Sequence, residues 1–162
     1  MIQLTIEKIP EKIKSCAFTG HREIGEDFSL EKLNKAIDEC IIRGCEEFFV
    51  GMAKGFDLIA GGEIVKRKKA GEKIKLFACI PYAKQSNSYA EEDKKLYKEI
   101  LRFADKKIQF FEEYTKWCMA TRNEYMADNA EVLIAYLQKE RGGTYQTVST
   151  FIKKKKGYIF YL

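Results

Sequence analysis

Short apolar runs alternate with stretches of helical periodicity along the chain, and this alternation limits the fold more than any other feature. The runs that predict strands cover residues 13–18, 47–50, 75–80, 106–111, 131–137 and 158–162. The stretches that predict helices cover residues 29–44, 57–70, 88–103, 116–129 and 144–152. Strand and helix in turn, joined by short links, predict a mostly parallel sheet with helices on both faces. Several strands are apolar throughout, which is typical of a sheet covered on both sides.

Local signals mark the ends of some of these elements. Ser29 is expected to cap the first helix, because a serine oxygen accepts a hydrogen bond from a free N–H of the first turn. Ser88 and Glu91 have the spacing of a capping box and predict the start of the third helix. Pro81 is expected to close the third strand, since proline has no N–H to donate.

The bulk composition places the chain among globular proteins with a single domain over residues 1–162. It has 162 residues, 46% of them apolar, and a net charge of +5. A mild positive charge serves solubility or attracts an anionic ligand, and charge alone does not separate the two. No signal peptide or membrane span is evident, so we expect a cytoplasmic protein.

The cysteines and the histidine argue against a metal centre. The five cysteines are odd in number, form no C-x-x-C, and mostly sit in apolar runs, which favours reduced thiols that pack as small core residues. His21 is the only histidine, whereas a zinc site usually needs three or four ligands. We expect no metal and no obligatory cofactor.

Four unusual segments follow four of the predicted strands. They are Thr19-Gly20-His21-Arg22, the run Gly51-Met52-Ala53-Lys54-Gly55-Phe56-Asp57, the run Pro81-Tyr82-Ala83-Lys84-Gln85, and Gly142-Gly143-Thr144. The carboxyl ends of parallel strands share one edge of the sheet, and ligands bind in the crevice at that edge. The sequence therefore predicts a binding site assembled from these segments.

Each segment has a chemical interpretation and a plainer structural one. Gly142, Gly143 and Thr144 open a helix and could cradle a phosphate, or simply form a glycine turn with a cap. Arg22 is the best candidate to pair with phosphate, because its guanidinium is a planar fork. Asp57 either caps its helix or accepts hydrogen bonds from ribose hydroxyls.

The remaining candidates are similarly open. Tyr82 and Gln85 could stack on and hydrogen-bond to a base, or cover the core. Arg122 and Asn123 could contact the ligand or lie on an exposed helix face. His21 is expected to hydrogen-bond to a ligand or to a neighbouring loop, and general acid–base catalysis is the lesser alternative. No catalytic residue is identified.

Taken together, these motifs resemble the YpsA-like branch of the SLOG superfamily over roughly residues 13–150. The resemblance is carried by FTGHR, GMAKGFD, IPYAKQ, the Arg122-Asn123 pair and the late GGT, in this order. It implies a Rossmann-like three-layer α/β/α fold and a nucleotide or nucleotide-derived ligand, in a protein of bacterial or phage origin. Related branches include LOG-type phosphoribohydrolases, DNA-binding DprA-like proteins, and sensors of signalling nucleotides.

One departure concerns catalysis. LOG-type enzymes carry P-G-G-x-G-T-x-x-E, and the glutamate is catalytic; here the run is R-G-G-T-Y-Q-T, which puts Thr147 at the glutamate position. A threonine cannot act as a carboxylate base. Whether the protein is an enzyme is therefore uncertain from the sequence.

Three functions follow, in order of preference. The first is a sensor or sequestering protein for a nucleotide-like small molecule, for example an ADP-ribose-like or other signalling nucleotide. The second is a hydrolase of a nucleotide N-glycosidic bond. The third is a nucleic-acid-binding module, motivated by the basic run of residues 153–156 and placed last because no basic stripe with interleaved aromatics is evident. A nucleic-acid partner and a membrane are not expected, and a homo-oligomer is left open.

Overall fold

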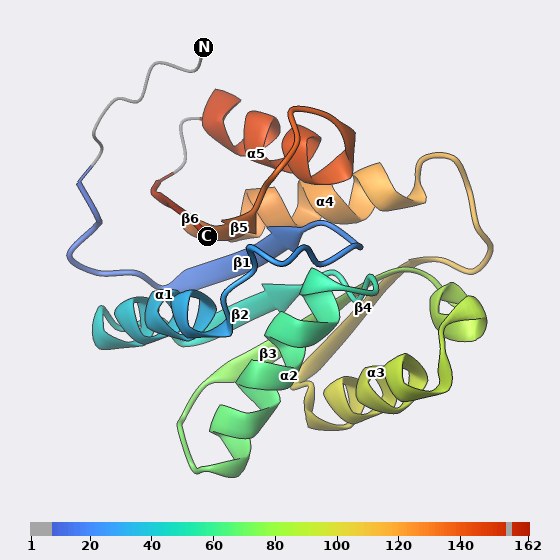
Figure 1. Cartoon of the computed structure of the whole chain (residues 1–162), viewed down its shortest axis with the longest axis horizontal. Helices are drawn as coiled ribbons and strands as arrows, with labels where there is room; N and C mark the ends of the chain where they lie inside the picture. The colour runs from blue at the N-terminus through green and yellow to red at the C-terminus, as the bar shows by residue number, and fades with distance from the viewer. Residues whose placement is uncertain (1–7, 155–156) are drawn as a thin grey trace.

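The computed structural model describes residues 8–154 and 157–162, which form a six-stranded sheet between two layers of helices (Figure 1). The strands are β1 (Ser15–Gly20), β2 (Glu47–Val50), β3 (Lys75–Tyr82), β4 (Lys106–Phe111), β5 (Val132–Tyr136) and β6 (Ile159–Tyr161). Every pairing between them is parallel, and their order across the sheet is β4-β3-β2-β1-β5-β6.

The helices are divided between the two faces of the sheet. They are α1 (Leu30–Ile42), α2 (Phe56–Lys69), α3 (Glu91–Phe103), α4 (Cys118–Asn129) and α5 (Gly142–Lys153), with the short 3-10 helix η1 (Gln85–Ser88). Figure 1 shows α1, α2 and α3 below the sheet and α4 and α5 above it. The expected three-layer, Rossmann-like α/β/α class is confirmed.

Strand order reverses between β1 and β5. From β1 the chain moves outward through β2 and β3 to β4, and then returns to place β5 on the other side of β1. The pairing of β1 with β5 aligns Cys16 with Val132 and Gly20 with Tyr136. Loops that leave β1 and β5 therefore diverge, which opens a crevice at the carboxyl end of this strand pair.

Two apolar clusters form the core, one on each face of the sheet. The larger packs β-strand side chains against α1, α2 and α3, and includes Phe18 stacked on Phe48 with ring centroids 5.8 Å apart. The smaller packs Met126 of α4 and Phe151 of α5 on the other face. All five cysteines are buried with free thiols, as expected of small core residues.

The predictions of where single helices and strands begin or end are only partly correct. Ser29 caps α1, and its hydroxyl accepts a hydrogen bond from the N–H of Lys32 at 3.2 Å. The capping box at Ser88 is wrong, because Ser88 ends η1 and α3 begins after Ala90 without a side-chain cap. Pro81 does not close β3, which continues to Tyr82. The pairing with β2 ends at Ala78, so the missing N–H of Pro81 costs no ladder bond on that side.

Within the described residues, no helix is long and apolar enough to cross a membrane. Of the basic run at residues 153–156, Lys153 ends α5 and Lys154 contacts Asp128, while residues 155 and 156 lie outside the described part of the chain.

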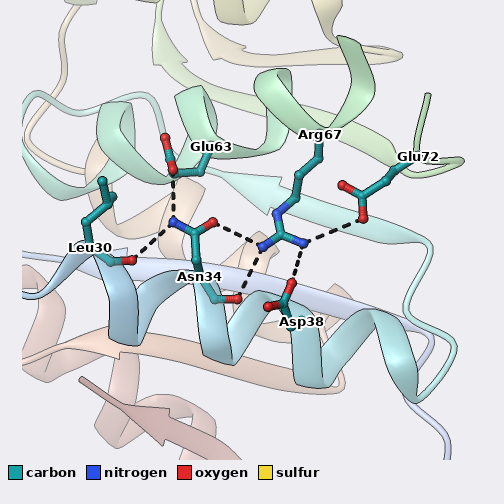
Figure 2. Close-up of polar contacts among 6 residues, drawn as sticks. All are labelled: Leu30, Asn34, Asp38, Glu63, Arg67 and Glu72. Carbon is teal, nitrogen blue, oxygen red and sulfur yellow. Dashed lines mark hydrogen bonds and ion pairs between the residues drawn. The ribbon is translucent and has the colours of Figure 1, made fainter. Parts of the chain in front are cut away.

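A polar network joins α1 to α2 around the guanidinium of Arg67 (Figure 2). Arg67 donates to the backbone and side-chain oxygens of Asn34 at 3.2 and 3.1 Å, and pairs with Asp38 at 2.6 Å and Glu72 at 3.6 Å. Asn34 also donates to Glu63 at 2.9 Å. The network fixes α2 against α1, and α2 in turn carries Asp57 at its start.

We expect Arg67→Met to lower the free energy of unfolding by about 1–3 kcal/mol, since several hydrogen bonds to one largely buried charged group, whose side chain is 14% exposed, are lost together. The neighbouring exposed Lys66, paired with Glu63 at 2.8 Å, is the matched control. Lys66→Met should cost about 0.5 kcal/mol or less. Urea denaturation of both variants measures this, and equal losses would contradict the importance given to Arg67.

Candidate functional site

A cleft of about 790 Å³ lies at the carboxyl end of the β1–β5 pair, where strand order reverses. Its walls come from the loop after β1, the starts of α2 and α5, the loop after β5, and one side of α4. The sequence-predicted residues that line it are Thr19, Gly20, His21, Arg22, Ala53, Asp57, Arg122, Asn123, Gly142, Gly143 and Thr144. Segments that are distant along the chain are therefore brought together as predicted.

The first turn of α5 opens into this cleft with its N–H groups uncapped by any side chain. Gly142 has a φ of +89°, a conformation that favours glycine, and Arg141 before it is extended. The first turn contains no acidic residue. The start of a helix carries free N–H donors and a partial positive charge, and so attracts anions. Arg22, Lys139 and Arg141 add positive charge to the lining.

His21 connects the loop after β1 to the loop after β5. Its Nε2 accepts a hydrogen bond from the backbone N–H of Gln138 at 2.7 Å, so the proton of the neutral ring lies on Nδ1. Burial lowers the pKa of His21, and the nearby charge of Lys139 lowers it further. The interpretation of His21 as a partner of a neighbouring loop fits this geometry.

Asp57 and Arg122 lie buried at the base of the cleft. Burial raises the pKa of Asp57 to about 6, although Arg122, the N–H of Ala53 and Arg22 all oppose the rise. The Asp57 carboxylate accepts from the N–H of Ala53 at 3.2 Å and does not cap α2, which begins after Gly55 without a side-chain cap. Near neutral pH, a ligand that donates a hydrogen bond would compensate this buried charge.

Arg122 is mainly engaged with protein atoms. Its guanidinium donates to the carbonyl of Gly51, to the side chain of Asn123 at 2.7 Å and to the sulfur of Met119 at 3.6 Å. A Cβ at Gly51 would lie 2.8 Å from the Arg122 Nη1 atom, so only glycine allows this approach. Arg122 is buried, which excludes the exposed helix face as an interpretation.

Six of the predicted residues do not line the cleft, and most of them shape it from behind. Gln85 is buried, and donates to the carbonyl of Gly51 at 3.3 Å while its own oxygen accepts from Tyr97. Met52, buried with a φ of 65°, accepts from the hydroxyl of Tyr89 at 3.1 Å. The others are Gly51, Gly55, Pro81 and Tyr82.

Gly55 shows why a glycine is needed behind the cleft. Its φ is +84°, and a Cβ there would lie 2.2 Å from the carbonyl oxygen of Arg22. The neighbouring N–H of Phe56 donates to the carbonyl of His21 at 3.1 Å. These contacts hold the loop after β1 against the start of α2.

Sequence reasoning missed several lining residues. Tyr136, the last residue of β5, accepts from the N–H of Gly25 and donates to Asp27, both at 3.0 Å, and so anchors the loop before α1. Gln138 and Lys139 also line the cleft. These two residues could have been found from the sequence, because they directly follow the most apolar predicted strand. The other segments were identified by the same feature, a position just after a strand.

Thr147, at the position of the LOG-type glutamate, does not line the cleft. It is buried, and its hydroxyl donates to the carbonyl of Gly143 at 2.9 Å. The residue therefore belongs to the internal structure of α5.

Comparison with known proteins identifies a family, a curated relative and structural neighbours. The YspA SLOG family model (YpsA) matches residues 20–161. The chain is 29% identical over 127 residues to the uncharacterized SPbeta prophage-derived protein YoqJ of Bacillus subtilis (strain 168), covering 70% of this chain and 74% of YoqJ.

Two solved structures of DNA processing protein A (DprA) share the fold. The Streptococcus pneumoniae structure aligns with a TM-score of 0.59 at 20% identity, covering 91% of this chain and 50% of that one. The Helicobacter pylori structure aligns with a TM-score of 0.60 at 18% identity, covering 92% of this chain and 66% of that one. The chain thus spans only half to two thirds of these proteins.

The second of these structures corrects one expectation. It describes a single-stranded DNA binding mode for the Helicobacter pylori protein. Because a protein that shares this fold binds single-stranded DNA, the expectation that a nucleic-acid partner is unlikely is contradicted.

The single histidine allows a direct test of the site by NMR. We expect the ring signal of His21 to titrate with a midpoint below 6.5, because protonation of Nε2 would break its bond with Gln138. Lys139→Gln should raise the midpoint but leave it below 6.5, since burial is the larger cause. The exposed Lys35, changed to Gln, is the control.

The stability effect has a defined sign. The folded protein holds this proton less tightly than the unfolded chain, so His21 stabilises the fold above pH 6.5 and that contribution is lost as the pH falls toward the lowered pKa. A midpoint at or above 6.5 would contradict the assigned hydrogen bond.

Proposed function

Because the chain belongs to the YspA SLOG family, we propose that its cleft binds the phosphate of a nucleotide or nucleotide-derived ligand, and that the protein acts as a sensor or sequestering protein for it. The observation that carries the proposal is the start of α5. Its uncapped N–H groups at Gly142–Thr144 open into the cleft at the reversal of strand order. Phosphates bind at such helix starts in many nucleotide-binding proteins.

The distribution of charge in the cleft suits a nucleotide. Arg22, Lys139 and Arg141 line the same cleft as the start of α5, and Asp57 and Asp27 line it as hydrogen-bond acceptors. A nucleotide could satisfy both the basic and the acidic side chains of the cleft. Its phosphate would lie at the start of α5, and its sugar hydroxyls would donate hydrogen bonds to a carboxylate. The volume, about 790 Å³, is within the range of small-molecule sites.

A hydrolase of the N-glycosidic bond is the second candidate, and Asp57 is the observation that favours it. Its carboxyl group lines the cleft with a pKa raised to about 6, so it can exchange a proton near neutral pH. Release of free base from a nucleoside monophosphate, lost in Asp57→Asn, would support this candidate. Binding without any turnover supports the sensor or sequestering function.

Isothermal calorimetry with nucleoside monophosphates, ADP-ribose, NAD and cyclic dinucleotides tests the proposal, with Gly143→Asp as the key variant. A Cβ at Gly143 meets only the Asn123 amide at 3.7 Å, which is ordinary van der Waals contact, and Gly143 is exposed. Its carboxylate suits the helix dipole but repels a phosphate, so we expect at least a tenfold loss of affinity with no loss of thermal stability.

Gln146→Glu is the matched control, since it adds the same charge on the exposed side of α5 away from the cleft. It should leave the affinity within about twofold, in line with the small effect of surface charges. Absence of binding across the panel by folded protein, or equal losses in both variants, would overturn the proposal.

A further inference from the structure

An exposed group of aromatic side chains lies on the edge of the sheet that holds the cleft, but outside it. Tyr82 ends β3, and Tyr114 and Trp117 lie in the connection between β4 and α4. Figure 1 shows this connection at the right of the molecule, on the same side as η1. We call Tyr82, Tyr114 and Trp117 the aromatic edge.

Two of the three rings of the aromatic edge are exposed, and Tyr82 is half-buried. Tyr114 is 64% exposed and Trp117 is 62% exposed. The rings of Tyr82 and Tyr114 meet edge to face, with centroids 5.4 Å apart. Lys116 lies over the Trp117 ring at 4.7 Å. Exposed rings beside a cation form the kind of surface on which nucleic-acid bases stack.

The aromatic edge is continuous with the cleft through α4. Trp117 directly precedes this helix, whose Met119, Arg122 and Asn123 line the cleft. The cleft lies at the ends of β5, β1 and β2, and the aromatic edge lies at the ends of β3 and β4. β3 lies two strand spacings from β1 and β4 lies three. At about 4.8 Å per spacing, the aromatic edge is therefore roughly 10 to 14 Å from the end of β1, a distance that a strand of several nucleotides spans.

The two areas differ in charge. The cleft is lined by four basic side chains and three acidic ones, which are Arg22, Arg122, Lys139 and Arg141 against Glu23, Asp27 and Asp57. Along the chain, the aromatic edge is flanked equally by Lys84 and Lys116 and by Glu112 and Glu113. We expect the phosphate to be held in the cleft, where the start of α5 adds free N–H donors. The aromatic edge contributes through stacking, which depends little on salt.

We propose that the aromatic edge stacks the bases of a single-stranded nucleic acid that has one phosphate held in the cleft. This inference rests on the proposed function, because the cleft supplies the phosphate site. It extends that function from a mononucleotide to a strand of several nucleotides. It also assigns a role to Tyr82, which the cleft does not use.

The test compares thymidine monophosphate with an octanucleotide of thymidine, and with the uridine octanucleotide to separate DNA from RNA. We expect the octanucleotide to bind at least tenfold more tightly than the monophosphate. Tyr114→Ala and Trp117→Ala should each weaken octanucleotide binding about fivefold or more, while monophosphate binding and the salt dependence stay unchanged. Arg141→Gln should weaken both ligands and reduce the salt dependence.

Ile42→Ala is the control, because Ile42 is 77% exposed at the far end of α1, and it should change nothing. Equal affinity for the monophosphate and both octanucleotides would overturn this inference and leave the proposed function in place. This inference is also overturned, and the proposed function kept, if the octanucleotide binds more tightly than the monophosphate but its affinity is unchanged by Tyr114→Ala and by Trp117→Ala. If neither the monophosphate nor an octanucleotide binds, this inference fails, and the proposed function is decided separately by calorimetry with the nucleotide panel.

Discussion

The pairing of β1 with β5 is the contact on which the rest of the site depends. It joins residues 16–20 to residues 132–136, and it places the ends of two strands side by side although their following loops diverge. The crevice between those loops is a consequence of topology, and the side chains that line it need only be polar and correctly spaced. His21 and Tyr136, at the ends of these two strands, each fix a loop to this frame.

Behind the cleft, a second set of contacts holds the loop after β2. The carbonyl of Gly51 accepts from both Gln85 and Arg122, and the carbonyl of Met52 accepts from Tyr89. These donors come from η1, α4 and the segment before α3, so three separate elements hold one short loop. The arrangement explains how Met52 is kept at a positive φ, which non-glycine residues rarely adopt. Several motif residues thus serve to build the site: Gly51, Met52 and Gln85 hold the loop from behind, while Arg122 both holds it and lines the cleft.

Much of the fold was predictable because strands and helices differ in their apolar period, and the expected elements match the observed ones to within a few residues. The cleft lies at the edge of the sheet where the sequence predicts a site, and three of the four marked segments line it, whereas residues 81–85 do not. The roles of single residues were not predictable. Gln85 and Arg122 look like ligand contacts in sequence, but the backbone carbonyl that each one satisfies becomes visible only in three dimensions. Ser88 fails as a cap because a 3-10 turn continues through it, and that turn has no clear sequence signal.

The separation along the chain of the two strands that frame the cleft has a consequence for folding. β1 and β2 with their helix are close in sequence, whereas the β1–β5 pairing closes a loop of more than a hundred residues. Contacts between distant segments carry a larger entropic cost of loop closure and slow the formation of the native state. During synthesis, the four strands from β1 to β4 can assemble first, and the cleft is completed only when β5 and α5 have joined them. The complete cleft is therefore a property of the finished chain, and any ligand held in it would stabilise the contacts that form last.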